Sequence, residues 1–386
     1  MFKLIRGGAV YTPEEIGVCD ILLCCGKIIK IGENIVPPQN LDVEIIEANG
    51  KKVVPGFVDG HIHILGAGGG AGPDSRSGLV HLSTFARAGV TSAIGTLGVD
   101  CVGYRLEELL IRARALEFEG ISTYMLCGSF MTPSATLTGS IMKDFSLIDK
   151  VVGVKIAMRE TLKNSPPIEM LAQIIQETWL GGRMSDKAGV VVSHIGDAKG
   201  SLAEVSDLLD VMAIPQRAFV ATHVNRSSEV LADAICCGKR GLIMDLTGNV
   251  PRHEKIAPSK ALRMILNQGV PLDNVTFSSD SGAAYEFDGV RGILPVDVCA
   301  KEIRAMVLAE GLSLSTALAT VTTNPARVYR LDATKGSLTV GKDADILLLD
   351  DDYRVDTVLA KGKLLVCEGR PVVRGRLEEP LLEILR

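Results

Sequence analysis

The middle of the chain repeats one pattern, in which a short β-branched segment is followed by a longer segment of helical character. Strands are predicted over residues 92–96, 151–156, 189–194, 218–223, 242–245 and 275–280. Helices are predicted over residues 105–119, 168–179, 201–209 and 229–237. Strands that alternate with helices favour a parallel sheet whose faces are covered. Eight such units close a (β/α)8 TIM barrel, so the sequence predicts an α/β fold of that class. The length of 386 residues leaves room for a small second domain.

The two ends of the chain differ from the middle, because they carry short strands separated by glycine turns. Residues 19–32 are typical of two strands joined by a turn, and residues 43–54 predict a hairpin around Asn49-Gly50, a strong turn signal. The C-terminal strands are predicted over residues 344–350, 357–366 and 370–373. We infer that the two ends pair with each other. The predicted domains are a small β-sandwich domain of residues 1–55 plus 335–386, and a barrel of residues 56–334.

Composition excludes several classes of partner. Hydrophobic residues make up 47% of the chain, which is enough for a sizeable core. A net charge of −5, with only 4% aromatic residues, gives no reason to expect nucleic acid or an anionic membrane as a partner. No stretch is typical of a signal peptide or a membrane span. The nine cysteines include no Cys-x-x-Cys pair, which suits reduced thiols and a cytoplasmic location.

Chemically active side chains gather at the ends of the predicted strands. His61 and His63 close an apolar run, and side chains at positions i and i+2 of a strand point to the same face, so the two imidazoles can share one metal ion. The same strand-end position is predicted for Lys155, His194, His223 and Asp280. Active sites of such barrels form at that end. A charge buried there is costly without a partner, which a metal cluster supplies. The remaining histidines, His81 and His253, are expected to be ordinary helix or loop residues.

Together these residues resemble the ligand set of the amidohydrolase superfamily, and residues 54–63 and 336–345 resemble the segments that flank its barrels. Within that superfamily the chain is most similar to isoaspartyl dipeptidases. The segments that carry the closer likeness are residues 68–73, 139–140, 143–144, 194–197, 222–226 and 278–280. The resemblance extends over essentially the whole chain.

The resemblance implies a binuclear metal centre and a reaction. Two divalent ions would be held by His61, His63, Lys155, His194, His223 and Asp280. Lys155 would be N6-carboxylated and would bridge the two ions. Zinc is the expected metal, although the donor set suits manganese, cobalt or nickel as well. Asp280 would be the catalytic base that takes a proton from the attacking water and delivers it to the leaving nitrogen. The resemblance also implies a homo-oligomer and a small-molecule or dipeptide substrate.

Several substrate-binding positions depart from the isoaspartyl dipeptidase pattern. Gly70 stands where the family has a glutamate that holds the substrate amino group, Phe130 where it has a carbonyl-polarising tyrosine, and Leu162 where it has a carboxylate-binding arginine. Ala284 and Val99 replace a serine and a threonine. The metal ligands are therefore kept while recognition of a β-linked aspartyl group is mostly lost.

Other residues are candidates for holding the substrate. Arg226 is retained and is expected to bind a substrate carboxylate, the alternative being a surface arginine that begins a helix. Arg76 and Arg159 are further candidates of the same kind. Gly68 and Tyr285 are expected substrate contacts, and either Tyr285 or Tyr124 could polarise the scissile carbonyl. These residues leave the identity of the substrate open.

The sequence leaves more than one function open. The predicted function is hydrolysis of an amide bond in the manner of an isoaspartyl dipeptidase, and the main alternative is a divergent amidohydrolase for a cyclic amide or an N-acyl amino acid. The glycine-rich residues 66–71 match a dinucleotide-binding motif, but Pro73 and Asp74 interrupt the helix that such a motif needs. A non-catalytic family member is disfavoured, because every expected metal ligand is present.

Overall fold

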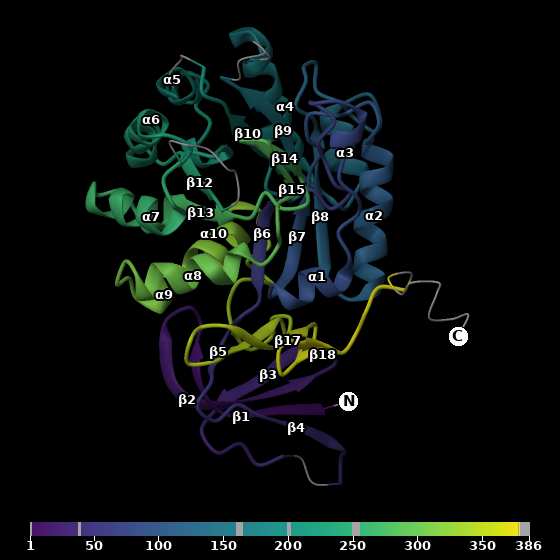
Figure 1. Cartoon of the computed structure of the whole chain (residues 1–386), viewed down its shortest axis with the longest axis vertical. Helices are drawn as coiled ribbons and strands as arrows, with labels where there is room; N and C mark the ends of the chain where they lie inside the picture. Colours follow the sequence, from purple (N-terminus) through teal and green to yellow (C-terminus); the bar gives the residue numbers. More distant parts are fainter. Residues whose placement is uncertain are drawn as a thin grey trace.

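The computed structural model describes residues 2–37, 40–159, 165–198, 202–248, 255–376 and 378. Figure 1 shows a barrel of strands ringed by helices, with a second sheet below it that is built from both ends of the chain. Leu162 and His253, two positions singled out in the sequence, lie outside the described residues. Among the described helices, none combines the length and the apolar character needed to cross a bilayer.

Eight parallel strands form the barrel. Their order in the sheet follows the sequence, and the last strand packs beside the first, so the sheet nearly closes. The strands are β6 (Phe57–Ile62), β7 (Val90–Gly95), β8 (Ser122–Gly128), β9 (Val151–Met158), β10 (Val190–Ile195), β11 (Phe219–Thr222), β12 (Ile243–Thr247) and β13 (Val275–Ser278). The predicted TIM-barrel fold is confirmed.

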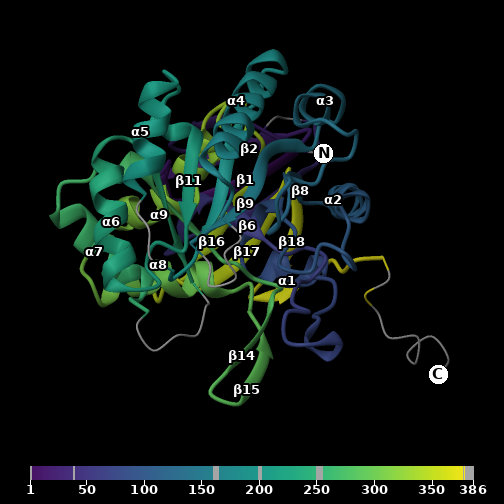
Figure 2. The ribbon, with the colours of Figure 1, turned by 90° about the horizontal axis from the view of Figure 1, so that it is seen from above.

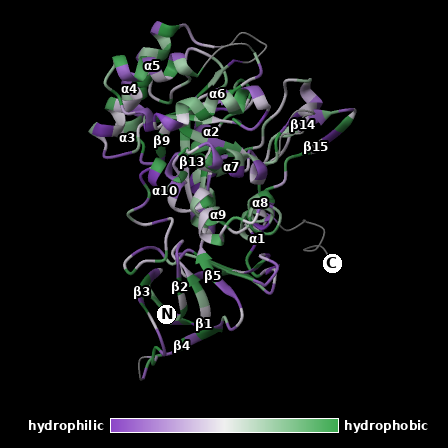
Figure 3. Ribbon diagram, turned by 90° about the vertical axis from the view of Figure 1, so that its left-hand side faces the viewer, coloured by the Kyte–Doolittle hydropathy of each residue, from purple (hydrophilic) through white to green (hydrophobic). Residues whose placement is uncertain are grey.

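Helices surround the barrel and bury one face each. They are α1 (Leu82–Arg87), α2 (Leu106–Glu119), α3 (Ile141–Leu147), α4 (Ile168–Met184), α5 (Ala203–Val211), α6 (Ser228–Lys239), α7 (Pro258–Asn267), α8 (Val298–Leu308), α9 (Leu314–Val321) and α10 (Thr323–Val328). In α4, Leu171, Ile174, Ile175 and Thr178 are buried, a spacing that places them on one helical face. Hydrophobic and hydrophilic residues accordingly alternate along α4 to α6 in Figure 3.

The interior of the barrel is filled at one end by aliphatic side chains. A buried cluster takes members from β6 to β12, Val58 and Ile243 among them, and packs them against Tyr329, which directly follows α10. The Tyr329 hydroxyl donates to the backbone oxygen of Gly60 at 2.7 Å. This plug is apolar, and the candidate site residues lie at the opposite end of the barrel, where the strands terminate.

The predicted pairing of the two ends of the chain is confirmed, and it takes the form of one nine-stranded sheet. From the N-terminal end come β1 (Phe2–Tyr11), β2 (Glu15–Cys24), β3 (Lys27–Gly32), β4 (Val43–Glu47) and β5 (Lys52–Pro55). From the C-terminal end come β16 (Ile346–Leu349), β17 (Val355–Ala360), β18 (Lys363–Cys367) and β19 (Arg370–Pro371). The two sets meet where β5 pairs antiparallel with β16. The boundaries at residues 55 and 335 stay a prediction.

The predicted hairpin between residues 43 and 54 is wrong. Its turn does form, because the Lys51 N–H donates to the Ala48 oxygen at 2.9 Å. However, β4 and β5 do not pair with each other, since both run parallel to β1. Both strands pair with β1, β4 beside residues 2–6 and β5 beside residues 9–10. The turn therefore moves the chain along β1 and does not reverse its direction. Asn49 of that turn packs against Gly7, whose φ of 70° suits a glycine.

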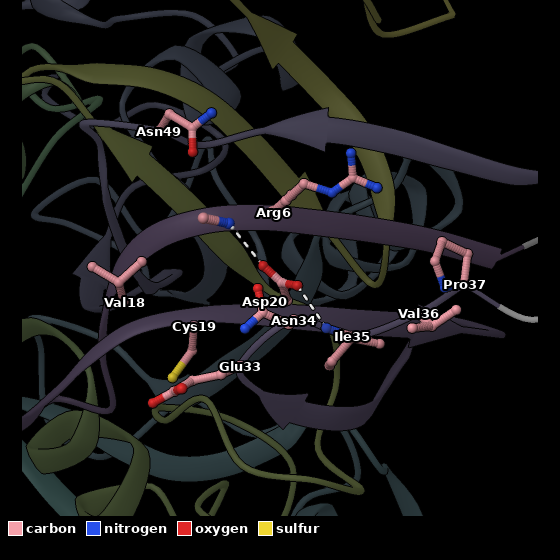
Figure 4. A pocket seen from close by; sticks show the side chains of 11 residues that line it. Arg6, Val18, Cys19, Asp20, Glu33, Asn34, Ile35, Val36, Pro37 and Asn49 are labelled. Carbon is pink, nitrogen blue, oxygen red and sulfur yellow. Dashed lines mark hydrogen bonds between the residues drawn. The ribbon is translucent and has the colours of Figure 1, made fainter.

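A hollow of about 720 Å³ lies on the terminal sheet and is drawn in Figure 4. Its buried acid, Asp20, accepts hydrogen bonds from the Gly7 N–H at 2.9 Å and from the Ile35 N–H at 2.8 Å. The carboxylate thus ties β1 to the loop that follows β3. Because both of its oxygens are satisfied by backbone, we assign Asp20 a structural role.

One buried cluster joins the terminal sheet to the barrel. The Lys335 ammonium donates to Asp345 at 2.6 Å and to the Ser122 hydroxyl of β8 at 2.7 Å, and it lies 2.7 Å from Asp343. Burial opposes the charge, but Asp345 and Asp343 outweigh that effect and raise the pKa of Lys335. The cluster fixes the segment before β16 against the start of β8.

A β-hairpin follows the last barrel strand and was not predicted. It consists of β14 (Ala284–Phe287) and β15 (Val290–Ile293), which pair only with each other. Figure 2, which views the molecule from above, shows it projecting beyond the rest of the chain. Its base lies beside the mouth of the barrel, because Ala283 bridges to Ala67 of the loop after β6.

Candidate metal centre

The six predicted metal ligands meet at one end of the barrel. His61 lies next to the last residue of β6 and His63 directly follows the strand. Lys155 lies on β9, His194 lies on β10, and His223 and Asp280 follow β11 and β13. All six line a cavity of about 200 Å³. The strand-end placement inferred from the sequence therefore brings these side chains together, although their roles as metal ligands stay a proposal.

Three of these residues form the tightest group. The Asp280 Oδ1 atom lies 3.1 Å from His63 Nε2 and 3.5 Å from His61 Nε2. Candidate ligand atoms of the three residues all lie within 4.8 Å of one another, and all three side chains are buried. Two imidazole nitrogens and one carboxylate oxygen suit a divalent ion of the first transition row.

The remaining donors extend the group around the cavity. The His61 and His223 rings are 5.3 Å apart between centroids, and the His223 and His194 rings are 4.6 Å apart. The Lys155 Nζ atom lies 3.1 Å from His61 Nε2. His194 and His223 form a second set of candidate ligands, which could hold a second ion. Lys155 lies beside His61 of the first set.

Hydrogen bonds to the rings decide which nitrogen three of the histidines offer. The His63 Nδ1–H donates to the backbone oxygen of Thr96 at 3.1 Å, and a carbonyl oxygen only accepts. The His223 Nδ1 atom lies 2.9 Å from the Thr247 hydroxyl. The His61 Nδ1 atom has the same kind of partner, described next. All three rings therefore direct Nε2 into the cavity, as expected when an outer partner orients a metal ligand.

A buried carboxylate, which the sequence interpretation missed, supports His61. The Thr222 hydroxyl lies 3.2 Å from His61 Nδ1 and donates its own hydrogen to Asp245. Asp245 also accepts from Thr276 at 2.7 Å and from Ser278 at 2.6 Å. Thr222 must therefore accept the hydrogen on His61 Nδ1. A visible signal existed in the sequence, since Asp245 is a lone acid inside an apolar run.

Asp59 is a second buried acid that the sequence interpretation missed. It accepts hydrogen bonds from the Ser279 N–H at 3.1 Å, from the Ser279 hydroxyl and from the His61 N–H at 3.3 Å. Burial raises the pKa of Asp59 to about 7, against the lowering effect of these hydrogen bonds. Asp59 thus links the loop that carries Asp280 to the strand that carries His61.

His194 is oriented in the opposite sense. Its Nε2 atom lies 3.2 Å from the Arg226 Nη1 atom, which can only donate. The ring of Phe130 packs edge-on against His194, with 5.0 Å between centroids. Arg226 and Phe130 together hold the ring in place.

The electrostatics of the cavity favour the protonation states that bind metals. Burial lowers the pKa of His61 and His223 well below the ordinary histidine value, and it lowers the pKa of Lys155 to about 8. Burial acts to raise the pKa of Asp280, but the neighbouring His223 and His63 hold it below its usual range. Neutral imidazoles, an ionised carboxylate and an amine that is easily deprotonated are the forms that coordinate cations or react to do so.

The backbone is strained at two of the candidate ligands. His223 has a φ of 71° and Asp280 has a φ of 55°, and both are non-glycine residues in the left-handed region. Such conformations cost about 1–3 kcal/mol each and persist where the surrounding structure enforces them. The Asp280 N–H donates to the His61 oxygen at 3.0 Å, which fixes the strained turn against β6.

The predicted substrate contacts line the same cavity. Gly68, Arg226 and Tyr285 are among its lining residues. Gly68 has a φ of 120°, and a Cβ there would collide with the Ser75 oxygen, so the position requires glycine. Gly70 is not part of that lining. Phe130, Val99, Ala284 and Leu294 supply apolar walls.

The alternative that Arg226 is a surface residue is wrong. Its side chain is buried, with the whole residue 4% exposed. It donates to the Ile195 oxygen, and its Nε atom lies 2.9 Å from an Asp197 carboxylate oxygen. The positive group is thus fixed at the cavity wall, beside His194.

Three other candidate residues lie away from the cavity lining. Tyr124 is wrong as a carbonyl-polarising group, because it lies near the start of β8, where it packs with the aliphatic plug. Arg76 pairs with Asp100, and Arg159 pairs with Asp233 at 2.8 Å. Their charges are neutralised locally. Position along a strand decides which end of the barrel a side chain reaches, and the sequence alone located Tyr124 only approximately.

The dinucleotide alternative also fails. The glycine-rich residues 66–71 are followed by a single 3-10 turn, η1 (Pro73–Ser75), and the next helix begins only at Leu82. A pyrophosphate site needs a helix that opens directly at the glycine loop. Here the loop instead folds against Ser75 and Ser77, whose hydroxyls accept its backbone N–H groups.

Comparison with known proteins agrees with this architecture. A model of the amidohydrolase family matches residues 52–365. The structure of a β-aspartyl dipeptidase from Fervidobacterium islandicum AW-1, solved in complex with a β-Asp-Leu dipeptide, is 36% identical, covers 96% of this chain and 98% of its own, and superimposes with a TM-score of 0.89. A dihydropyrimidinase from Brevibacillus agri is 16% identical, with 97% of each chain covered and a TM-score of 0.68, which shows the shared fold alone.

Curated sequence relatives include adenine deaminases. The protein from Methanococcoides burtonii is 27% identical over 91% of this chain and 55% of its own length. Adenine deaminase 1 of Latilactobacillus sakei is 24% identical over 98% of this chain and 59% of its own length. The chain therefore spans little more than half the length of these relatives. The family match over most of the chain, joined to the barrel and its strand-end residues, shows that this protein belongs to the amidohydrolase family.

Proposed function

We propose that this protein is a binuclear metal-dependent hydrolase that cleaves the amide C–N bond of a small substrate. The observation that carries the proposal is the set of four oriented histidines, Lys155 and Asp280 around one buried cavity. These imidazoles, the Lys155 amine and the Asp280 carboxylate converge on the cavity. A buried cluster of this kind is most stable with cations bound.

The residues divide naturally between two ions. His61, His63 and Asp280 would hold one ion, and His194 with His223 would hold the other. Lys155, N6-carboxylated by CO2, would help to hold both, and the reaction of its neutral amine with CO2 releases one proton. Zinc is the metal we propose. Bound divalent ions supply Lewis acidity and lower the pKa of water toward neutrality.

Asp280 handles the proton in the proposed reaction. Its carboxylate is ionised in the folded protein, so it can take a proton from the attacking water. It then delivers that proton to the leaving nitrogen as the C–N bond breaks. Water adds across the bond, giving one carboxylic acid and one amine. The fixed, left-handed backbone at Asp280 keeps the carboxylate at the ligand group throughout.

Substrate binding is assigned to Arg226 and Tyr285. Arg226 would bind a substrate carboxylate through charge-assisted hydrogen bonds, exchanging part of its contact with Asp197. Tyr285, the one tyrosine in the cavity lining, would donate to the scissile carbonyl. A β-aspartyl dipeptide is the first substrate to test, because the 36% identical dipeptidase was solved with one.

The apolar walls favour a second candidate substrate. Val99, Phe130, Ala284 and Leu294 face the cavity, and none can bind the amino group of a dipeptide. An N-acyl amino acid has one carboxylate for Arg226 and an apolar acyl group for these walls. A cyclic amide of similar size is a variant of the same idea.

A substrate panel tests the proposal. Metal-loaded protein would be assayed with β-Asp-Leu, N-acyl amino acids and cyclic amides, with Asp280→Asn as the inactive control. We expect amide hydrolysis, with aspartate released from β-Asp-Leu. Turnover of N-acyl amino acids alone would select the second candidate. Full metal content without hydrolysis of any amide would contradict the proposed function.

A further inference from the structure

A second cavity lies at the opposite end of the barrel from the metal centre. It has a volume of about 660 Å³, within the range of small-molecule sites. Val190 and Ile243, the first residue of β10 and the first residue of β12, form part of its floor together with Val328. His194 lies four residues further along β10, about 13 Å away at 3.3 Å per residue. The two cavities are therefore separate.

The lining of this cavity is strongly cationic for a chain with a net charge of −5. Its charged residues are Arg183, Lys187, Arg217, Arg327, Arg330, Asp273 and Asp332. Five cations against two acids leave an excess of three positive charges. A concave wall of one sign attracts counter-ions of the opposite sign.

Some of these cations are already paired. Arg327 makes a bidentate ion pair with Asp273, at 2.9 Å and 3.1 Å. Arg330 pairs with Asp186, and Lys187 donates to the backbone oxygens of Phe145 and Ile148. Within the described part of the chain, Arg183 and Arg217 have neither an ion pair nor a hydrogen bond from their guanidinium groups. Two arginines are thus available to a ligand.

An aromatic ring accompanies the two arginines. Trp179, the single tryptophan of the chain, lines the cavity, and it lies four residues before Arg183 on α4, so the two side chains share one helical face. Arg217 approaches from the 3-10 turn η2 (Gln216–Ala218) that precedes β11. Guanidinium groups bind phosphate oxygens bidentately, and a tryptophan ring stacks on flat heterocycles.

We propose that this cavity is a binding site for a small phosphorylated heteroaromatic ligand, such as a nucleoside diphosphate. Arg183 and Arg217 would bind the phosphates, Trp179 would stack on the ring, and Val190, Ile243 and Val328 would contact its apolar face. The site neither requires nor contributes to the metal centre. It would therefore give a barrel hydrolase a second ligand on its far side.

The single tryptophan makes the proposal directly testable. Emission from Trp179, excited at the red edge of its absorption, would be followed while ADP, inorganic pyrophosphate or adenosine is added to the full-length protein. We expect a saturable change with ADP, weaker binding of pyrophosphate and weaker binding still of adenosine. Added salt should weaken the binding of ADP, since the attraction is largely electrostatic.

Substitutions of the two arginines test whether ADP binds in this cavity or elsewhere on the protein. Arg183→Gln with Arg217→Gln should weaken ADP binding by about tenfold or more, as removal of charge-assisted hydrogen bonds predicts. The matched control is Arg354→Gln, which removes an exposed arginine that pairs with Asp352. It should leave ADP binding unchanged. Arg183→Lys keeps the charge and should lose part of the affinity, because an ammonium cannot bind bidentately.

Three outcomes would overturn the proposal. The first is no saturable change with either ADP or pyrophosphate at millimolar concentration. The second is ADP binding that the double variant leaves intact, which would locate the ligand elsewhere. The third is light scattering that shows an oligomer dissociated by the double variant, in which case the cavity is a subunit interface. Circular dichroism of the double variant should match the parent, because both arginines are exposed.

Discussion

Two buried lysines at opposite ends of the barrel have opposite properties. Lys155 is 2% exposed and Lys335 is 3% exposed, so burial disfavours the charge on both. Lys335 has two carboxylates and a hydroxyl within hydrogen-bonding distance, and its pKa rises. Lys155 has an imidazole nitrogen as its nearest polar partner, and its pKa falls to about 8. The partners, and not the depth of burial, decide which lysine keeps its proton.

The comparison separates a structural cluster from a chemical one. Around Lys335, two carboxylates meet two ammonium groups, because Asp343 also pairs with Lys27 at 2.6 Å, so the charges balance without any ligand. Around Lys155, four imidazoles and an amine face a single ligand carboxylate, so nitrogen groups outnumber carboxylates in this cluster. We infer that the first holds two sheets together and that the second is built to receive cations. Each prediction below concerns either the Lys335 cluster or the Lys155 cluster.

The largest expected effect is on catalysis at the metal end. Asp280→Asn removes the group that moves the proton and should lower kcat by about 10²–10⁴-fold, the range typical of general acid–base catalysis. The measurement is steady-state hydrolysis of the best substrate from the panel, with metal content checked on the same sample. Near-normal kcat in a metal-loaded variant would remove Asp280 as the base.

The next effect is on stability at the other end. Lys335→Ala leaves the buried Asp345 without its cation, while the half-buried Asp343 keeps Lys27, and it should lower the free energy of unfolding by about 3–5 kcal/mol. Lys301→Ala is the control, since it removes an exposed lysine paired with Asp297 four residues earlier, and it should cost no more than about 0.5 kcal/mol. Urea unfolding measures both. Equal losses of unfolding free energy in the two variants would show that Lys335 contributes no more than an exposed ion pair does.

Lys155→Met should behave in the reverse way. It removes a buried amine without a carboxylate partner, so the free energy of unfolding of the metal-free protein should be unchanged or higher. Metal content, measured by elemental analysis, should fall, and added short carboxylic acids should restore part of it by replacing the lost bridge. A variant that keeps its full metal content without such acids would contradict the proposed bridging role.

A smaller effect on metal affinity is expected from a residue that hydrogen-bonds to one of the proposed ligands. Thr222→Val keeps the shape of the side chain but leaves the His61 Nδ1–H without an acceptor and Asp245 without one donor. Loss of such an outer partner typically lowers metal affinity by about 10–100-fold. Competition with a fluorescent chelator measures the affinity. Thr276→Val, which also removes a donor to Asp245 but does not touch a histidine, should change it less.

The smallest effect concerns alkaline pH. The folded-state pKa of Lys335 lies above the ordinary value of 10.5, so the folded protein holds this proton more tightly than the unfolded chain. The resulting stability is fully present below the unfolded pKa and is lost as pH rises through the folded pKa. The difference in unfolding free energy between the parent and Lys335→Met should therefore be constant near pH 8–9 and should shrink above about pH 10.4. A constant difference up to pH 12 would argue against a charged Lys335.

The sequence was most informative where a polar residue interrupts an apolar run. Lys155 and Asp280 stand out for that reason, and the barrel topology then brings them to one end together with the histidines. Asp245 had the same signal and was missed, because its importance depends on the register that places Thr222, Thr276 and Ser278 around it. The turn at Asn49 was correctly located, but its neighbours found parallel partners on β1, which local sequence cannot reveal.

The pairing of β5 with β16 has a consequence for how the chain folds. Nearly three hundred residues separate these partners in the chain. Residues 52–55 therefore cannot pair until residues 346–349 have been synthesised. All eight barrel strands lie between them in the chain and are synthesised first. During synthesis, which proceeds from the N-terminal end, the barrel can become compact while β1 to β5 still lack their C-terminal neighbours. The terminal sheet can therefore close only after all eight barrel strands have been synthesised.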